Sequence, residues 1–192
     1  MSSQVESYSL PPAVRRVASD FRLVGVISFW TQLVLAIVST LVLLFAIFSF
    51  NTRSNGGNPG TGAGLFLVIC GLVALYVGAY WAFSYIRLSK RLRTADPRNR
   101  PKPKDATQAL RLGLIINLAG MLLTILGGEA IIGALLAKSL AQPQGGAIFA
   151  ERLTQFVQPL DIFVVQANIN IILAHFCGVV GSIWLIWRVN RQ

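Results

Sequence analysis

Four long apolar stretches, separated by polar or basic segments, dominate the hydrophobic pattern of the chain. Each is longer than the ~20 residues that a helix needs to cross a bilayer. The pattern predicts transmembrane helices at about residues 23–50, 63–86, 108–137 and 162–188. We therefore expect an all-α fold, with residues 1–192 forming one polytopic membrane domain.

Two shorter amphipathic segments precede the first and the fourth stretch. Val14, Val17 and Phe21 recur at helical spacing before the first, and residues 148–160 present an apolar face before the fourth. Each segment is expected to form a short interfacial helix, the second of them closed by Pro159. No cleavable signal peptide is visible ahead of the first stretch.

Composition agrees with membrane insertion, since 54% of the residues are hydrophobic and 12% are charged. The net charge of +10 would suggest nucleic-acid binding in a soluble chain, but here the basic residues mainly flank the apolar stretches. Placing both termini and the segment from Arg87 to Arg111 in the cytoplasm puts fourteen of the seventeen basic residues inside. This orientation follows the positive-inside rule, and no nucleic-acid partner is expected.

The basic loop at residues 87–105 allows two interpretations. Its first basic residues, Arg87, Lys90, Arg91 and Arg93, are candidates for binding anionic lipid head groups or an acidic partner. Alternatively, the charges only set the orientation of the helices in the membrane. The two interpretations are compatible.

The fourth apolar stretch carries more polar side chains than an anchor requires. One set recurs every seven residues, and the stripe that it forms on a helix should face protein or water. This set is Asp161, Asn168, His175 and Ser182. A second set lies on another side of the helix, which indicates contact with more than one neighbour. It is Gln166, Asn170, Cys177 and Gly181.

His175 is the single histidine of the sequence and falls near the middle of the predicted membrane span. An imidazole at that depth is able to ligate a cation or pass a proton, but one histidine does not make a metal site. A structural hydrogen bond to another helix is the alternative. Gln32 is also near the middle of its span and allows the same two interpretations, a bond to the fourth helix or contact with a substrate.

Two acidic residues are further candidates. Glu129 falls in the outer part of the third span, where it either serves a function or reaches water at the interface. Asp161 is placed to cap the fourth helix or to pair across its mouth. Cys70 and Cys177 lie at different predicted depths and are not expected to form a disulfide.

Glycine repeats predict close helix packing. Gly64, Gly71 and Gly78 recur at seven in the second stretch, and small residues from 113 to 128 follow one face of the third. The chain has no phosphate-binding loop, HExxH or CxxC pair, or nucleophile motif. We therefore expect neither an enzyme nor a cofactor.

Several stretches resemble a known family across most of the chain. They are SFWTQLVLAIVS (28–39), YWAFSYIRLSKRLR (80–93), LRLGLIINLAG (110–120) and LDIFVVQANINIILAHFCG (160–178). They are similar to the chloroplast inner-envelope family known both as the twenty-one-kilodalton translocon component and as "permease in chloroplasts", which has cyanobacterial homologues. The resemblance implies four membrane spans and either iron uptake or assistance in protein import. The chain itself is identified as a cyanobacterial member.

The resemblance also implies which residues carry the function. The matching positions are Trp30, Gln32, Tyr85, Arg87, Asn117, Asp161, Gln166, Asn170 and His175. Glu129 and Asn168 are not among them, so the emphasis moves from the heptad stripe to Asn170 with His175.

The leading hypothesis is a permease for iron or another metal cation, acting as an oligomer in the cell inner membrane or the thylakoid membrane. The alternative is a non-catalytic scaffold that packs through its glycine faces against a translocase or photosynthetic complex.

Overall fold

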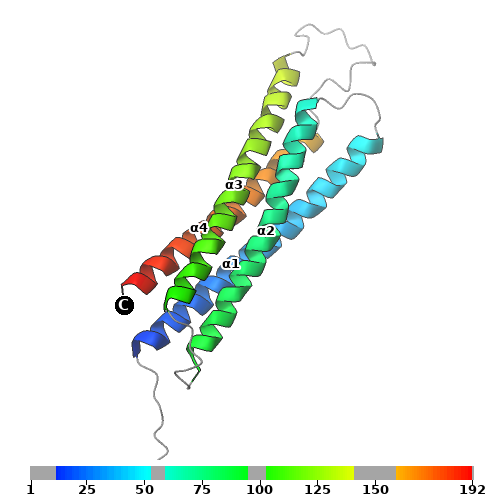
Figure 1. The fold of residues 1–192 in the computed structure, drawn as a ribbon. Helices are drawn as coiled ribbons and strands as arrows, with labels where there is room; N and C mark the ends of the chain where they lie inside the picture. Colours follow the sequence, from blue (N-terminus) through cyan, green and yellow to red (C-terminus); the bar gives the residue numbers. More distant parts are fainter. Residues whose placement is uncertain (1–11, 53–58, 95–102, 141–158, 192) are drawn as a thin grey trace, which may run out of the picture.

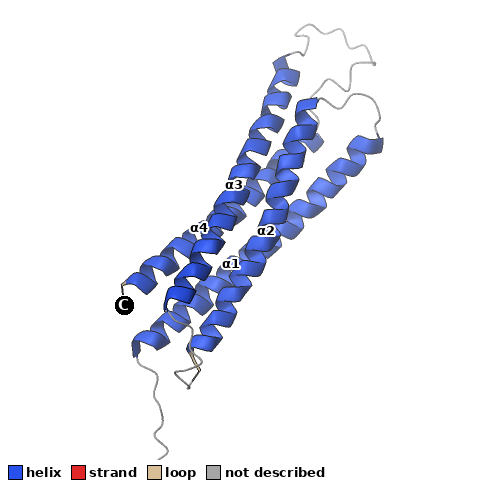
Figure 2. Ribbon diagram, viewed as in Figure 1, coloured by secondary structure: helices blue, strands red, loops and turns tan. Residues whose placement is uncertain are grey.

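The structure, a computed structural model, describes residues 12–52, 59–94, 103–140 and 159–191. These residues form four helices, α1 (Pro12–Thr52), α2 (Pro59–Leu92), α3 (Pro103–Leu140) and α4 (Pro159–Asn190). Figure 2 shows helix through these ranges and no strand within them. The predicted all-α fold with four long helices is confirmed.

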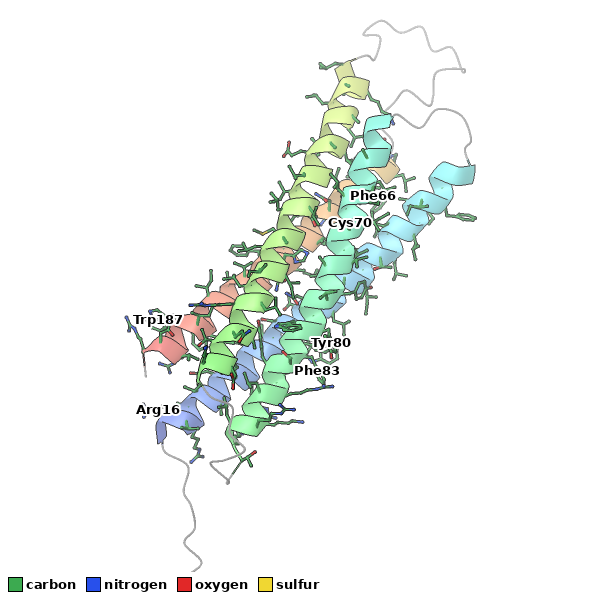
Figure 3. All side chains as sticks on the ribbon, viewed as in Figure 1. Arg16, Phe66, Cys70, Tyr80, Phe83 and Trp187 are labelled. Carbon is green, nitrogen blue, oxygen red and sulfur yellow. The ribbon has the colours of Figure 1, made fainter. Side chains whose placement is uncertain are left out.

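Each helix contains a segment that is long and apolar enough to cross a membrane. The segments are Val14–Ser49, Gly62–Leu92, Lys104–Leu140 and Pro159–Asn190. The outer surface is strongly apolar: Phe66 and Tyr80, which Figure 3 labels on α2, have 64% and 61% of their surface exposed. In a bilayer this surface contacts lipid tails, and the chain is a multi-pass membrane protein.

The helices form an elongated bundle in which consecutive helices are antiparallel (Figure 1). Each packs against two neighbours in the order α1, α2, α3, α4 and back to α1, while α2 and α4 make a smaller diagonal contact. One end of the bundle, called the basic end below, holds the start of α1, the end of α2, the start of α3 and the end of α4. Arg16 and Trp187 both lie there in Figure 3. Among the described residues, Lys138 is the one basic residue outside this end.

The prediction of a separate interfacial helix before the first span is wrong. α1 runs without a break from Pro12, and Ala18 and Phe21 are fully buried. Phe21 makes an edge contact with the ring of Tyr85 and joins an apolar cluster with Leu185. The apolar face of this segment therefore packs against protein rather than lying on the membrane surface.

The start of α4 also differs from the prediction. Pro159 was expected to close an interfacial helix, but it is the first residue of α4, a position where a proline loses no helical hydrogen bond. The predicted interfacial helix itself falls mainly on residues 148–158, outside the described part of the chain.

α2 and α3 extend into the predicted loop at 87–105. α2 continues to Leu92, with Lys90 and Arg91 in its last turn, and α3 begins at Pro103. Basic side chains are favourable at a helix C-terminus because of the helix dipole, and a proline is well tolerated at a helix start. The charges that indicated a loop are therefore compatible with longer helices.

Candidate functional site

A layer of three polar side chains crosses the centre of the bundle. It consists of Gln32 from α1, Asn117 from α3 and His175 from α4, and is called the polar layer below. Their exposed fractions are 0%, 3% and 0%. Along these three helices the layer lies between an apolar cluster at the basic end and a larger one towards the opposite end. Polar groups at this depth are costly in a membrane protein unless other protein groups satisfy them.

Asn117 is the centre of the layer. Its Nδ2 donates to the carbonyl of Gly113 at 2.8 Å, which sets the orientation of the carboxamide. Its Oδ1 then accepts from Gln32 Nε2 at 2.8 Å and lies 3.1 Å from His175 Nδ1. Gln32 Nε2 is also 3.4 Å from the carbonyl of Ala174. The predicted interhelical bond of Gln32 therefore reaches α3 as well as α4.

His175 spans the bundle from α4 towards α2. Its second ring nitrogen, Nε2, lies 3.1 Å from the carbonyl oxygen of Gly71. The layer thus connects all four helices, three by side chains and α2 through its backbone. This arrangement fixes the imidazole between two oxygen atoms.

Glycines provide the room for these side chains. A Cβ on Gly120 would overlap the ring of His175, and one on Gly178 would overlap Gln32 Nε2. A Cβ on Gly78 would come within 3.0 Å of Asn117 Oδ1. The glycine repeats therefore serve the polar layer as well as helix packing.

The heptad stripe of α4 faces the bundle interior. Its four members, Asp161, Asn168, His175 and Ser182, are at most 5% exposed. Asp161 lies 4.0 Å from Lys138 Nζ on α3, and Ser182 Oγ is 3.3 Å from the hydroxyl of Tyr85. Asp161 is the third residue of α4 and lies in its first turn. The predicted pairing across the helix mouth is observed with Lys138, and the capping role stays a prediction.

Two buried oxygen atoms have no hydrogen-bond partner among the described residues. They are Oε1 of Gln32, in the polar layer, and Oδ1 of Asn168. Asn168 lies seven residues before His175, about 10 Å along α4, and its Nδ2 approaches Gly128 of α3. Unpaired buried acceptors are uncommon in folded proteins and call for an explanation.

Two members of the second polar set of α4 lie apart from the polar layer. Gln166 is exposed and donates from Nε2 to Oδ1 of the half-buried Asn170 at 3.1 Å, four residues further along the same helix. Gly181, another member, packs against α1, where a Cβ would come within 2.8 Å of Ser28 Oγ. Asn170, to which the resemblance moved the emphasis, therefore lies apart from the polar layer, whereas Asn168 of the stripe is buried.

The other predicted candidates lie outside the core. Glu129 is exposed, although Gly128 beside it is buried. The exposed residues Arg87, Lys90 and Arg91 lie on the last turns of α2 at the basic end, and Arg93 follows in a turn. The guanidinium of Arg87 stacks 4.8 Å above the ring of Phe83, which holds it against the bundle.

The described residues contain no group of three or more His, Cys, Asp or Glu side chains that would hold a metal ion. Both cysteines, Cys70 and Cys177, are free and half-buried.

Asn117 is the residue that analysis of the sequence alone undervalued. Its spacing from neighbouring glycines predicted only a packing face, and the family resemblance alone included it among the matching positions. The available signal was an amide within the apolar run LIINLAGMLL. The carbonyl of Gly71 gave no signal, because every residue has one.

Comparison with known proteins shows the family to which the chain belongs. The profile of the family described as "Protein of unknown function (DUF3611)" matches residues 11–190. The chain belongs to the DUF3611 family. It is also similar to "Protein TIC 21, chloroplastic" of Arabidopsis thaliana, with 34% identity over 196 aligned residues that cover 98% of this chain. This match confirms the resemblance to the chloroplast family.

The chain spans 64% of the length of that plant relative. No solved structure matches the chain. All four helices lie within the residues that the family profile matches.

Proposed function

We propose that the chain is a membrane permease for a small cation, with the polar layer as its central binding position. The proposal rests mainly on Oε1 of Gln32, a fully buried atom. This oxygen has no hydrogen-bond partner among the described residues, although Gln32 belongs to a hydrogen-bonded network. A network that only held helices together would be expected to satisfy its acceptors. A free buried amide oxygen offers a ligand to a passing cation or its hydration water.

Asn168 supports a path rather than a single site. Its unpaired Oδ1 lies on the same face of α4 as His175, and Asp161 lies seven residues further towards the far end. These side chains succeed one another at about 10 Å intervals. We infer that a cation enters at the far end between Asp161 and Lys138 and reaches the polar layer past Asn168.

The glycine contacts leave little free space in the bundle centre, so passage requires the helices to move apart. Four helices are few for an alternating-access carrier, which usually contains inverted repeats. We therefore propose that the permease works as a homo-oligomer in the cell inner membrane or the thylakoid membrane. Chemical crosslinking in native membranes followed by mass measurement tests this arrangement.

The alternative, a scaffold docked through its glycine faces, is weakened by the contacts within the chain. Gly64 and Gly127 approach each other's backbones across α2 and α3, and Gly71 lies against Gly120 and Thr124. These faces are occupied by the chain's own helices and are not available to a partner. We also infer that the protein is not an enzyme.

Uptake of radioactive iron or manganese by vesicles containing the purified protein tests the permease proposal. Wild-type vesicles should accumulate the metal faster than protein-free vesicles. Equal uptake by the two preparations would refute the proposal. Recovery of the protein in native membranes only as part of a complex with unrelated subunits would favour the scaffold.

The orientation with both ends cytoplasmic remains a prediction. In a background without Cys70 and Cys177, Lys90→Cys at the basic end should react with an impermeant maleimide only from the cytoplasmic side. Ser139→Cys, at the far end of α3, should react only from the opposite side. The reverse pattern in vesicles of known sidedness would overturn the assignment.

A further inference from the structure

The imidazole of His175 faces an oxygen acceptor at each nitrogen. Nδ1 is 3.1 Å from Oδ1 of Asn117, and Nε2 is 3.1 Å from the carbonyl oxygen of Gly71. A carbonyl oxygen accepts hydrogen bonds and never donates. A neutral imidazole carries one N–H group, so it can satisfy only one of these two contacts.

The carboxamide orientation of Asn117 is supported by two further contacts. Its Nδ2 donates to the Gly113 carbonyl, and its Oδ1 accepts from Gln32 Nε2, each at 2.8 Å. Turning Asn117 alone would place Oδ1 against the Gly113 carbonyl and Nδ2 against Gln32 Nε2. Both contacts would then be unfavourable, oxygen against oxygen and N–H against N–H.

Turning Gln32 as well removes only part of the conflict. Oε1 of Gln32 would then accept from Asn117, but it would also face the Ala174 carbonyl, to which Nε2 now lies at 3.4 Å. The oxygen atoms of Asn117 and Gly113 would still face each other. The arrangement described here is therefore the one that suits a ring with two N–H groups.

We propose that His175 is a proton-binding site at the centre of the bundle, whose occupancy is coupled to the orientation of the Asn117 and Gln32 carboxamides. With the proton on Nδ1, that nitrogen donates to Asn117 Oδ1 while Nε2–H donates to Gly71 O. When the proton leaves, Nδ1 becomes an acceptor and both carboxamides turn, so that Asn117 Nδ2 donates to it.

No charged side chain contacts the ring among the described residues. The groups packed against it are the amide of Asn117 and the backbone at Gly71 and Gly120. The nearest titratable groups on these helices are Cys70, beside Gly71, and Cys177, two residues after His175. On α1, which reaches the layer through Gln32, the nearest charged residue of the described chain is Arg22, ten residues away.

The charged pairs lie far along the bundle. Asp161 with Lys138 is fourteen residues from His175, about 21 Å, and Arg188 with Asp20 is thirteen residues away, about 20 Å. A proton on the ring is therefore held by hydrogen bonds rather than by a counter-ion. Such a proton is readily released when the amides turn. This property suits a group that binds and releases a proton in each cycle.

The proton site rests on the geometry of the polar layer, and its use as a coupling ion for cation movement rests on the proposed function. Proton release from Nδ1 would turn Gln32, so that its Oε1 accepts from Asn117 and is no longer unpaired. The proton would thus control whether this oxygen is free to meet a cation.

Nitrogen NMR tests the proposal directly, because His175 is the only histidine of the chain. Full-length protein in lipid nanodiscs is labelled with ¹⁵N at histidine and asparagine and observed from about pH 5 to about pH 8, where imidazoles commonly titrate. We expect a doubly protonated ring at the acidic limit, a neutral ring at the other, and a change of the Asn117 amide signal over the same range. A single neutral tautomer throughout, or a titration without the Asn117 change, would overturn the proposal.

Asn117→Leu provides a variant of similar size without the acceptor. At about pH 6 it should hold at least ~tenfold less doubly protonated ring, the effect of losing a hydrogen bond to a charged group. Asn170→Ala, on the outer side of α4, should match wild type. If Asn117→Leu does not fold, the wild-type titration alone decides.

The outcome is separable from transport. A ring that titrates in a protein with no metal uptake would refute the permease and leave the proton site standing. Metal uptake by a protein whose ring never titrates would refute the proton site alone.

Discussion

Vesicles containing His175→Ala are expected to take up iron or manganese at least ~tenfold more slowly than wild-type vesicles, a change equivalent to ~1.4 kcal/mol. The substitution removes the only imidazole of the polar layer and leaves Gly71 O and Asn117 Oδ1 with one donor fewer. The initial uptake rate at equal protein incorporation is the measurement.

Two further variants separate a transport role from a structural one. His175→Gln retains a polar group of similar length, so it should restore stability but not uptake. Asn170→Ala should keep wild-type uptake, because Asn170 bonds only to Gln166 on the outer side of α4 among the contacts described. Full uptake by His175→Gln, or equal losses in His175→Ala and Asn170→Ala, would contradict the role given to the histidine.

Gly127→Ala is expected to lower the free energy of unfolding by about 1–3 kcal/mol, as overpacking does in tight interiors. A Cβ on Gly127 would lie 2.7 Å from the carbonyl oxygen of Gly64 and 2.9 Å from the backbone nitrogen of Val68. Backbone atoms cannot rotate away as a side chain does, so α2 and α3 would have to separate. Thermal unfolding in detergent, followed by circular dichroism, measures the effect.

Gly133→Ala is the matched control on the same helix. A Cβ at Gly133 meets nothing within 4 Å, so the change should leave stability unchanged or raise it by up to ~1 kcal/mol, because alanine is the better helix former. Equal destabilisation by the two substitutions would contradict the role given to the contact between α2 and α3.

The glycine repeats predicted close helix packing but not the identity of the packing partner. Gly64, Gly71 and Gly78 predicted a close helix partner, and they have one, but the partner is α3 of the same chain. A small-residue repeat specifies a short distance between backbones. It does not specify whether the second backbone belongs to the same molecule.

The candidate site was predictable only in part. The heptad from Asp161 to Ser182 indicated a face turned towards protein, and all its members are buried. Which of those residues act together was not predictable, because Gln32 and Asn117 are 85 positions apart in sequence. Asn168 belongs to that heptad and packs against Gly128, whereas Asn170 lies on another side of the same helix.

Helix ends were the weakest part of the prediction. The apolar content of the sequence indicates which residues lie in the bilayer. α1 begins before that apolar segment, because Phe21 packs on Tyr85 and stabilises the additional turns. Likewise, the basic residues after Arg87 suggested a loop, although α2 continues to Leu92. A charged helix turn outside the bilayer has no hydrophobic signal that distinguishes it from a loop.

The sequence by itself determined the number of membrane helices, their approximate positions and the inward face of α4. Those properties follow from the free energy of transferring side chains from water to lipid. Each residue contributes to this free energy independently of the tertiary structure. Only the tertiary structure decided that Gln32, Asn117 and His175 meet, that Gly71 supplies the fourth contact, and that two amide oxygens stay unpaired. A hydrogen bond between distant segments is lost when their separation changes by a few tenths of an ångström. These separations are set by how the glycine faces of all four helices pack.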